Sequence, residues 1–338
     1  MKHVYPSKVL ISGGKPAGGV ASYAEALGQG FAAHGLPVEV VSPASIVRCP
    51  RELRDPAVLK ILSLGAVFAA PVARRAICMA HGFPCAAHQG WTRTLAILGS
   101  YRLANACRGA QLLAVSDYSA LHLRSIFNLR VDAVVRNPVL PLFLEDAAQP
   151  GAMREAITYV GRLHRSKNIH KVLPAMRDVL DENDGLRAWI VGDGPMRETL
   201  EKMAGGDRRI EFLGMLSPVQ VREKLRRSRV FVSANPTEPF GIVYLEALSQ
   251  GCAVAMPASG GGLEIAPELI GSQIQLFAAS ADRASVASAL RRALCASPAI
   301  PPLASYSAGE VAKAYLAADA RFNAHGIFCP EVDSDGCQ

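Results

Sequence analysis

Hydrophobic residues along the chain alternate between two patterns. Short apolar runs predict buried strands, and segments with apolar positions three and four apart predict helices between them. At the start, the apolar run 7–12 leads into a glycine-rich loop over 13–19, a helical face from Val20 to Phe31, and a second apolar run over 37–42. A strand, a glycine loop, a helix and a strand in this order predict a doubly wound α/β domain.

The pattern restarts after 145–153, where Pro150-Gly151 and small polar residues are typical of a linker. We therefore predict two Rossmann-like domains facing a cleft, an N-terminal one over 1–150 and a C-terminal one over 151–306. A last helical pattern lies within 307–325, and the polar tail 326–338 is expected to be disordered. Further strands are predicted at 76–80, 111–116, 131–135, 156–160, 188–191, 210–212, 230–233 and 253–256.

Two further predictions concern local structure, a buried helix and a helix cap. The apolar stretch 61–73 is too short to span a bilayer and is expected to form a buried helix. Ser119 is placed to cap a helix over 119–127.

The eight cysteines form no C-x-x-C pair, so they do not indicate a zinc or redox site and are expected to be small buried apolar groups.

The net charge of +7 lies entirely in the first half of the chain. Residues 1–150 hold 15 basic and 8 acidic side chains, whereas 151–338 hold 21 of each. This asymmetry indicates an anionic partner for the N-terminal domain, such as a membrane surface or a lipid diphosphate. A basic surface that only keeps the protein in solution explains it equally well. We expect no nucleic-acid partner, and a cytoplasmic location with possible peripheral binding at the inner face of the membrane.

The segment 237–248 carries two carboxylates, Glu238 and Glu246, with seven residues between them. Glu238 falls in a loop after a strand, and Glu246 falls within the next helix. Pro239 and Gly241 are placed to shape the turn so that backbone N–H groups at the helix start face an anion.

A second cluster of charge follows the strand predicted at 156–160. Gly161 and Arg162 come at the strand end, and Lys167 follows five residues later. Two fixed cations at such a position stabilise a departing diphosphate more than the intact substrate, because negative charge accumulates as the bond breaks.

These segments resemble glycosyltransferase family 4: 237–254 is similar to its E-x7-E signature, and 161–167 to its G-R-x4-K pattern. The resemblance implies the GT-B fold, retention of anomeric configuration, and a final helix that crosses back onto the first domain. It implies that Glu238 meets the donor sugar, that Glu246 meets the ribose, and that Arg162 and Lys167 clamp the diphosphate. The other site residues that it implies are His81 near the transferred sugar and, for donor binding, Gly18, Gly19, Gly192, Phe240 and Gly241. Glu264 receives no role.

The sequence therefore predicts a retaining glycosyltransferase that moves a hexose to a saccharide or lipid-linked acceptor in bacterial polysaccharide or glycolipid synthesis. A UDP- or GDP-sugar is the favoured donor. We expect no cofactor and no metal, because the one Asp-x-Asp triplet, 333–335, lies in the polar tail. Two alternatives stay open: a nucleotide-sugar epimerase or hydrolase on the same scaffold, and a non-catalytic subunit that binds sugar nucleotides.

Overall fold

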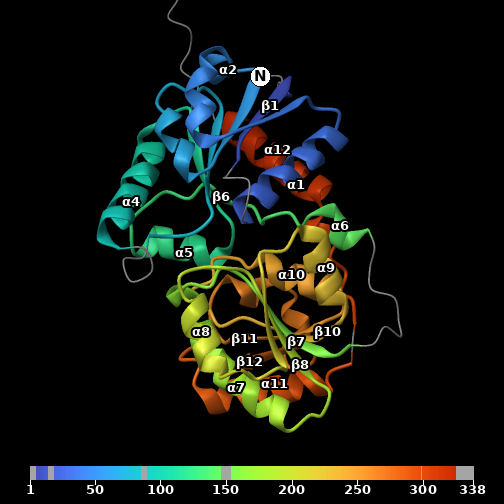
Figure 1. The fold of residues 1–338 in the computed structure, drawn as a ribbon. Coiled ribbons are helices and arrows are strands. Elements are labelled where there is room, and N and C mark those ends of the chain that lie inside the picture. The colour runs from blue at the N-terminus through green and yellow to red at the C-terminus, as the bar shows by residue number, and fades with distance from the viewer. Residues whose placement is uncertain (1–4, 14–18, 85–89, 146–153, 298, 325–338) are drawn as a thin grey trace, which may run out of the picture.

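Two parallel sheets of six strands each form the framework of the molecule (Figure 1). The computed structural model describes residues 5–13, 19–84, 90–145, 154–297 and 299–324. The first sheet has the order β2-β1-β3-β4-β5-β6, and the second has the order β12-β11-β10-β7-β8-β9. The strands of the first sheet are β1 (Lys8–Ser12), β2 (Val38–Val41), β3 (Val58–Leu62), β4 (Ala76–Ala80), β5 (Ala110–Ala114) and β6 (Ala133–Val134). Those of the second are β7 (Ala156–Val160), β8 (Arg187–Val191), β9 (Ile210–Gly214), β10 (Ser228–Val232), β11 (Ala253–Pro257) and β12 (Ile274–Phe277).

Both faces of the first sheet are buried, which explains why its strands are continuous apolar runs. On one face, Val9 and Ile11 pack with α1 (Gly19–Ala33) and α12 (Ala308–Ala324). On the other face, Leu10 packs with the remaining elements of this domain. These are η1 (Pro43–Arg48), α2 (Pro50–Arg54), η2 (Leu64–Ala69), α4 (Trp91–Ala106) and α5 (Asp117–Ser125).

The second sheet is covered in the same way. One face packs against α7 (Ile169–Asp181), α8 (Arg197–Ala204) and α11 (Arg283–Cys295). The other face packs against α9 (Pro218–Arg226) and α10 (Ile242–Ser249). Short turns at the domain boundary and in the loops complete the chain. They are α6 (Pro141–Leu144), η3 (Arg165–Lys167), η4 (Gly261–Glu264), η5 (Pro267–Leu269) and η6 (Ala304–Tyr306).

The last helix, α12, lies against α1 of the N-terminal domain, as predicted (Figure 1). The Tyr23 and Tyr315 hydroxyls are 2.6 Å apart in the contact. An added Cβ on Gly30 would lie 2.0 Å from the Ala308 carbonyl oxygen, so the two helices touch backbone to backbone there. Helix α12 is also bonded to the residue before β4, through a buried ion pair between Arg75 Nη2 and Asp319 Oδ2 at 2.6 Å.

The prediction of a helix over 61–73 is wrong. Residues 58–62 form β3, and 64–69 form the 3-10 helix η2. Lys60 hid the strand, because a lysine inside an apolar run resembles a boundary. In the fold Lys60 is fully buried, and its ammonium group donates to the carbonyl oxygens of Asp55 and Arg74. Burial lowers its pKa to about 8.

Two further expectations differ from the structure in detail. Ser116, not Ser119, caps α5: its hydroxyl accepts the N–H of Ser119 at 3.0 Å. The strand predicted at 131–135 is reduced to the two residues of β6. The linker beyond residue 145 and the tail from 325 lie outside the described residues.

Candidate functional site

The strand order of the second sheet reverses between β7 and β10. Strands β8 and β9 follow β7 on one side, whereas β10, β11 and β12 lie in sequence on the other side of β7. Strands β7 and β10 are therefore hydrogen-bonded neighbours although they are far apart in sequence. In open parallel sheets, ligands bind outside the carboxyl ends of the strands at such a switch point. Both charged segments singled out in the sequence come directly after these two strands.

Lys167 and Glu238 meet at this switch point. Lys167 Nζ lies 2.6 Å from Glu238 Oε2, and the Asn235 side chain donates to the same oxygen at 2.8 Å. Burial opposes ionisation of Glu238, but the charge and hydrogen bond of Lys167 outweigh it, and the pKa of Glu238 is lowered. The carboxylate is thus ionised at neutral pH and held in one orientation. Asn235 was not foreseen, although its position just after a buried strand was a signal.

Arg162 lies in the same region with its side chain exposed. The Tyr159 hydroxyl donates to the Arg162 carbonyl at 3.2 Å, and the charges of both Glu238 and Arg162 act on the Tyr159 hydroxyl. Among the described residues no hydrogen bond or ion pair holds the guanidinium group. Arg162 is therefore placed to bind an anion at the end of β7.

Gly192 has a packing function. Its φ is 125°, and an added Cβ would lie 2.0 Å from the Gly161 carbonyl oxygen. The loops after β7 and β8 thus pack backbone to backbone, and the Gly161 N–H donates to the Val191 carbonyl at 3.0 Å. This contact fixes the loop that delivers Arg162. A direct donor contact of Gly192 stays a prediction.

Helix α10 begins immediately after the Glu238 loop. Gly241, with φ of 91°, is its N-cap, and a Cβ there would lie 2.4 Å from the Tyr244 ring. Phe240 is buried against Tyr306, their ring centroids 6.1 Å apart, so any donor contact of Phe240 would come from its backbone.

Glu246 on α10 is a buried carboxyl group, 8% exposed. Within the described part of the chain, no side chain or backbone N–H donates a hydrogen bond to it. Burial raises its pKa to about 7. A buried carboxylate without donors is unfavourable, and hydroxyl groups of a ligand would supply the missing hydrogen bonds.

His81 directly follows β4 in the N-terminal domain. Its ring packs edge-on against Tyr23, with centroids 4.4 Å apart. Burial lowers its pKa to about 4, with the Asn137 side chain acting weakly in the opposite direction, so the imidazole is neutral at neutral pH. Its Nε2 has no hydrogen-bond partner among the described residues. A hydrogen bond between His81 and the transferred sugar stays a prediction.

The two domains meet beside Glu238. A Cβ added to Gly82, the residue after His81, would lie 3.3 Å from the Pro239 ring. The Ser116 hydroxyl donates to the Pro239 carbonyl at 2.5 Å. The loops after β4, β5 and β10 are therefore in contact, which brings His81 to the side of the interface facing the Glu238 loop. Gly19 is the first residue of α1, and Gly18 lies outside the described residues.

The chain is similar to known glycosyltransferases. Residues 154–296 match the family model described as glycosyl transferases group 1. The sulfoquinovosyl transferase SQD2 of Arabidopsis thaliana is 30% identical over 169 residues, which are 48% of this chain and 31% of that protein. The alpha-monoglucosyldiacylglycerol synthase of Streptococcus pneumoniae is 34% identical over 98 residues, 28% of this chain and 22% of that protein. The chain thus spans about a third or less of these relatives.

Solved structures resemble nearly the whole chain. WaaG, a glycosyltransferase involved in lipopolysaccharide biosynthesis, superposes with a TM-score of 0.66 at 14% identity, over 93% of this chain and 94% of that one. Anabaena HepE in complex with UDP-glucose gives 0.63 at 18% identity, over 95% and 96%. The chain has the GT-B fold.

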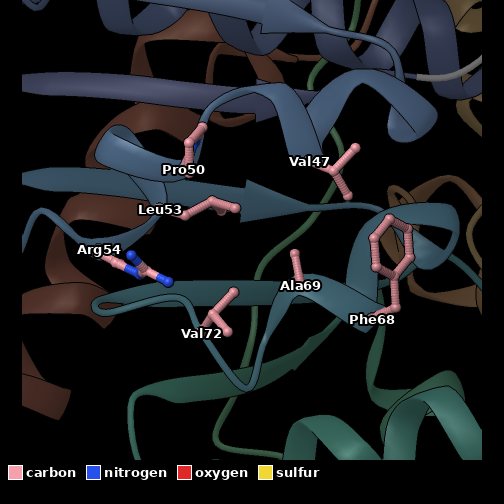
Figure 2. Close-up of a pocket in the computed structure, with 7 residues that line it drawn as sticks. All are labelled: Val47, Pro50, Leu53, Arg54, Phe68, Ala69 and Val72. Carbon is pink, nitrogen blue, oxygen red and sulfur yellow. The ribbon is translucent and has the colours of Figure 1, made fainter.

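One pocket lies apart from the candidate site. An apolar pocket of about 170 Å³ opens on the N-terminal domain, between η1, α2 and η2 (Figure 2). It is lined by Val47, Pro50, Leu53, Arg54, Phe68, Ala69 and Val72, none of them a predicted site residue. Across the described ranges, no three His, Cys, Asp or Glu side chains group as metal ligands, and no helix is long and apolar enough to cross a bilayer.

Proposed function

We propose that the chain is a retaining glycosyltransferase that moves a hexose from a UDP- or GDP-sugar to a saccharide or lipid-linked acceptor without a metal ion. The observation that carries the proposal is the arrangement at the switch point between β7 and β10. There Lys167 and Glu238 are paired and Arg162 extends from the adjoining loop, while the buried Glu246 lies further along on α10. Cations and carboxylates in this order match the phosphate, sugar and ribose parts of a nucleotide sugar.

In the proposed reaction, the bond between the anomeric carbon and the β-phosphate oxygen breaks while the acceptor oxygen bonds to that carbon from the same face. The acceptor proton passes to the departing phosphate oxygen. Arg162 and Lys167 stabilise the charge on the diphosphate, and Glu238 stabilises the positive charge on the sugar. When the donor is bound, the Lys167 ammonium group donates to a phosphate oxygen as well as to Glu238.

An anionic lipid surface is the proposed partner of the basic N-terminal domain, at the cytoplasmic face of the membrane. Helix α4 exposes Trp91, Leu95 and Leu103 at spacings of four and eight residues, which place them on one face. The helix also carries Arg93 and Arg102 and no acidic residue. An apolar stripe with basic neighbours suits a helix lying in a lipid headgroup region. A relative named for a glucosyldiacylglycerol product supports a lipid acceptor.

Thermal-shift measurements with UDP-, GDP-, ADP- and dTDP-sugars test the donor class. A nucleotide sugar present at about 100 times its dissociation constant should add roughly 2.7 kcal/mol of stability. The shift should be largely lost in Glu246→Ala and persist in Glu268→Gln, a variant of an exposed glutamate that is not one of the predicted site residues. If none of the four donors stabilises the wild-type protein, the proposal is wrong.

The alternatives differ in the step after donor binding. An epimerase or hydrolase would convert the donor in the absence of acceptor, and a binding subunit would shift in melting temperature without any turnover. The observation that bears on catalysis is the pairing of Lys167 with Glu238, which keeps this carboxylate ionised and in one orientation.

A further inference from the structure

A buried hydrogen-bond network joins the two domains next to Glu238. Besides donating to the Pro239 carbonyl at 2.5 Å, the Ser116 hydroxyl accepts the N–H of Ser119. The Ser119 hydroxyl donates to the same carbonyl at 3.3 Å. Both serines are fully buried. The first turn of α5 is therefore bonded to the residue directly after Glu238.

Glu264 makes a second connection between the domains. Its carboxylate accepts the N–H of Asp117 at 2.9 Å and the N–H of Tyr118 at 2.6 Å. These are the first two amides of α5, which no helix can satisfy internally, and they lie at its positive end. Glu264 belongs to the C-terminal domain and α5 to the N-terminal domain, so this helix is capped across the interface.

Gly261, three residues before Glu264, allows the segment 260–264 to lie close to the Glu238 loop and to Ser116. A Cβ on Gly261 would lie 2.0 Å from the Pro239 carbonyl oxygen and 3.0 Å from Ser116 Oγ. The Gly261 N–H donates to the Glu238 carbonyl at 2.8 Å. One short segment, 260–264, thus holds both the backbone of the Glu238 loop and the helix of the opposite domain.

We propose that Glu264 and Ser116 are positioning residues that fasten α5 to the Glu238 loop, so that the placement of Glu238 depends on contact between the two domains. Each oxygen of the Glu264 carboxylate accepts one backbone N–H from the first turn of α5, so the group bonds the opposite domain through both of its oxygens. Its effect on transfer rests on the proposed function, whereas the contact itself does not.

Hydrogen exchange of the free protein tests the contact without any substrate. Glu264→Ala should increase the exchange rate of the amides at 117–119 by about tenfold, since a lost helix cap weakens local protection by about this factor. Glu264→Gln, which keeps the size and one acceptor, should give a smaller increase and carries the test if the alanine variant does not fold. The control Glu268→Gln should leave the rates unchanged. Wild-type exchange rates in both Glu264 variants would overturn the proposal.

Kinetics then separate positioning from donor binding. Glu264→Ala and Ser116→Ala should each lower kcat by roughly tenfold while the Kd of free UDP or GDP, measured by calorimetry, stays within about twofold. If Glu264→Ala weakens nucleotide binding as much as it lowers kcat, Glu264 belongs to the donor site and the positioning role is wrong. If the wild-type protein neither binds nor transfers, the proposed function fails, and hydrogen exchange still decides whether the contact exists.

Discussion

Glu246 should make the free protein less stable than it would be with a neutral residue, and Glu246→Gln tests this directly. The glutamine has the size and polarity of the protonated acid and cannot ionise. Burial raises the pKa of Glu246 from 4.5 to about 7. Below about pH 4.5 Glu246 is protonated in both the folded and the unfolded state, so its ionisation does not change the free energy of unfolding. Between pH 4.5 and 7 the unfolded state loses the proton first, so stability falls as the pH rises.

The full cost is reached above pH 7. A difference of this size between folded and unfolded pKa corresponds to roughly 3 kcal/mol. Glu246→Gln should therefore stabilise the free protein by up to about 3 kcal/mol at pH 8 and leave it nearly unchanged at pH 4. In a chain of 338 residues that is a rise of about 4 °C in melting temperature.

Urea unfolding at pH 4, 6 and 8, monitored by the fluorescence of the buried Trp189 in the same domain, measures the effect. Glu268→Gln is the control and should show no such pH dependence. Equal stability changes at all three pH values, or a loss of stability at pH 8, would refute the reasoning.

The same group should link nucleotide binding to pH. Hydrogen bonds from ribose hydroxyls favour the ionised carboxylate and lower its pKa in the complex. Affinity for the free nucleoside diphosphate should therefore rise as the pH rises to about 7 and then level off. Glu246→Gln should bind about 10- to 100-fold more weakly at pH 8, the loss expected for charge-assisted hydrogen bonds, and lose the pH dependence. Glu246→Ala should chiefly raise the donor KM. Calorimetric affinity that does not vary with pH in the wild-type protein would contradict the ribose assignment.

Four further predictions concern other parts of the molecule. Glu238→Gln should lower kcat by roughly 10² to 10³ and bind free nucleoside diphosphate normally; unchanged kinetics would remove Glu238 from the reaction. Asp319→Ala should reduce the free energy of unfolding by about 3 kcal/mol or more in a urea titration, because it leaves Arg75 charged and buried, and a loss below about 1 kcal/mol would show the pair to be dispensable. Gly192→Ala should destabilise by at least about 2 kcal/mol, because the new Cβ meets the neighbouring loop, whereas Gly99→Ala, with open space around it, should not. Turnover should survive excess EDTA, and rescue of a lost activity by Mn²⁺ or Mg²⁺ would contradict metal-independent catalysis.

Most of the fold was predictable because both sheets are parallel and buried. Strands 76–80 and 156–160 were predicted at their observed bounds, since helices cover both faces and leave continuous apolar runs. Strand β3 was missed because Lys60 interrupts its run, and only the folded chain shows the carbonyl oxygens that satisfy its ammonium group. Helix α4 was missed because the apolar residues on its exposed face obscure the helical period.

The candidate site was predictable where it depends on local sequence and not where it depends on the partner domain. Lys167 and Glu238 are 71 positions apart, yet each follows a predicted strand, and the resemblance to family 4 assigned both to the donor. Ser116 and Glu264 carried no comparable signal. Ser116 bonds the Pro239 carbonyl and Glu264 bonds the start of α5, so both contacts form only where the two domains meet, and no spacing within either domain encodes them.

The central claim is that this site transfers a sugar. Radiolabelled UDP-glucose and GDP-mannose should be incubated with the protein and with a lipid and oligosaccharide extract of its expression host, and the products separated by phase partition and chromatography. The account predicts that label from one donor enters the lipid or saccharide fraction with the wild-type protein and with Glu268→Gln, and that this incorporation falls at least about 100-fold with Glu238→Gln. Label that appears only as free sugar or as an epimerised nucleotide sugar, at a rate that does not depend on the extract, would contradict it.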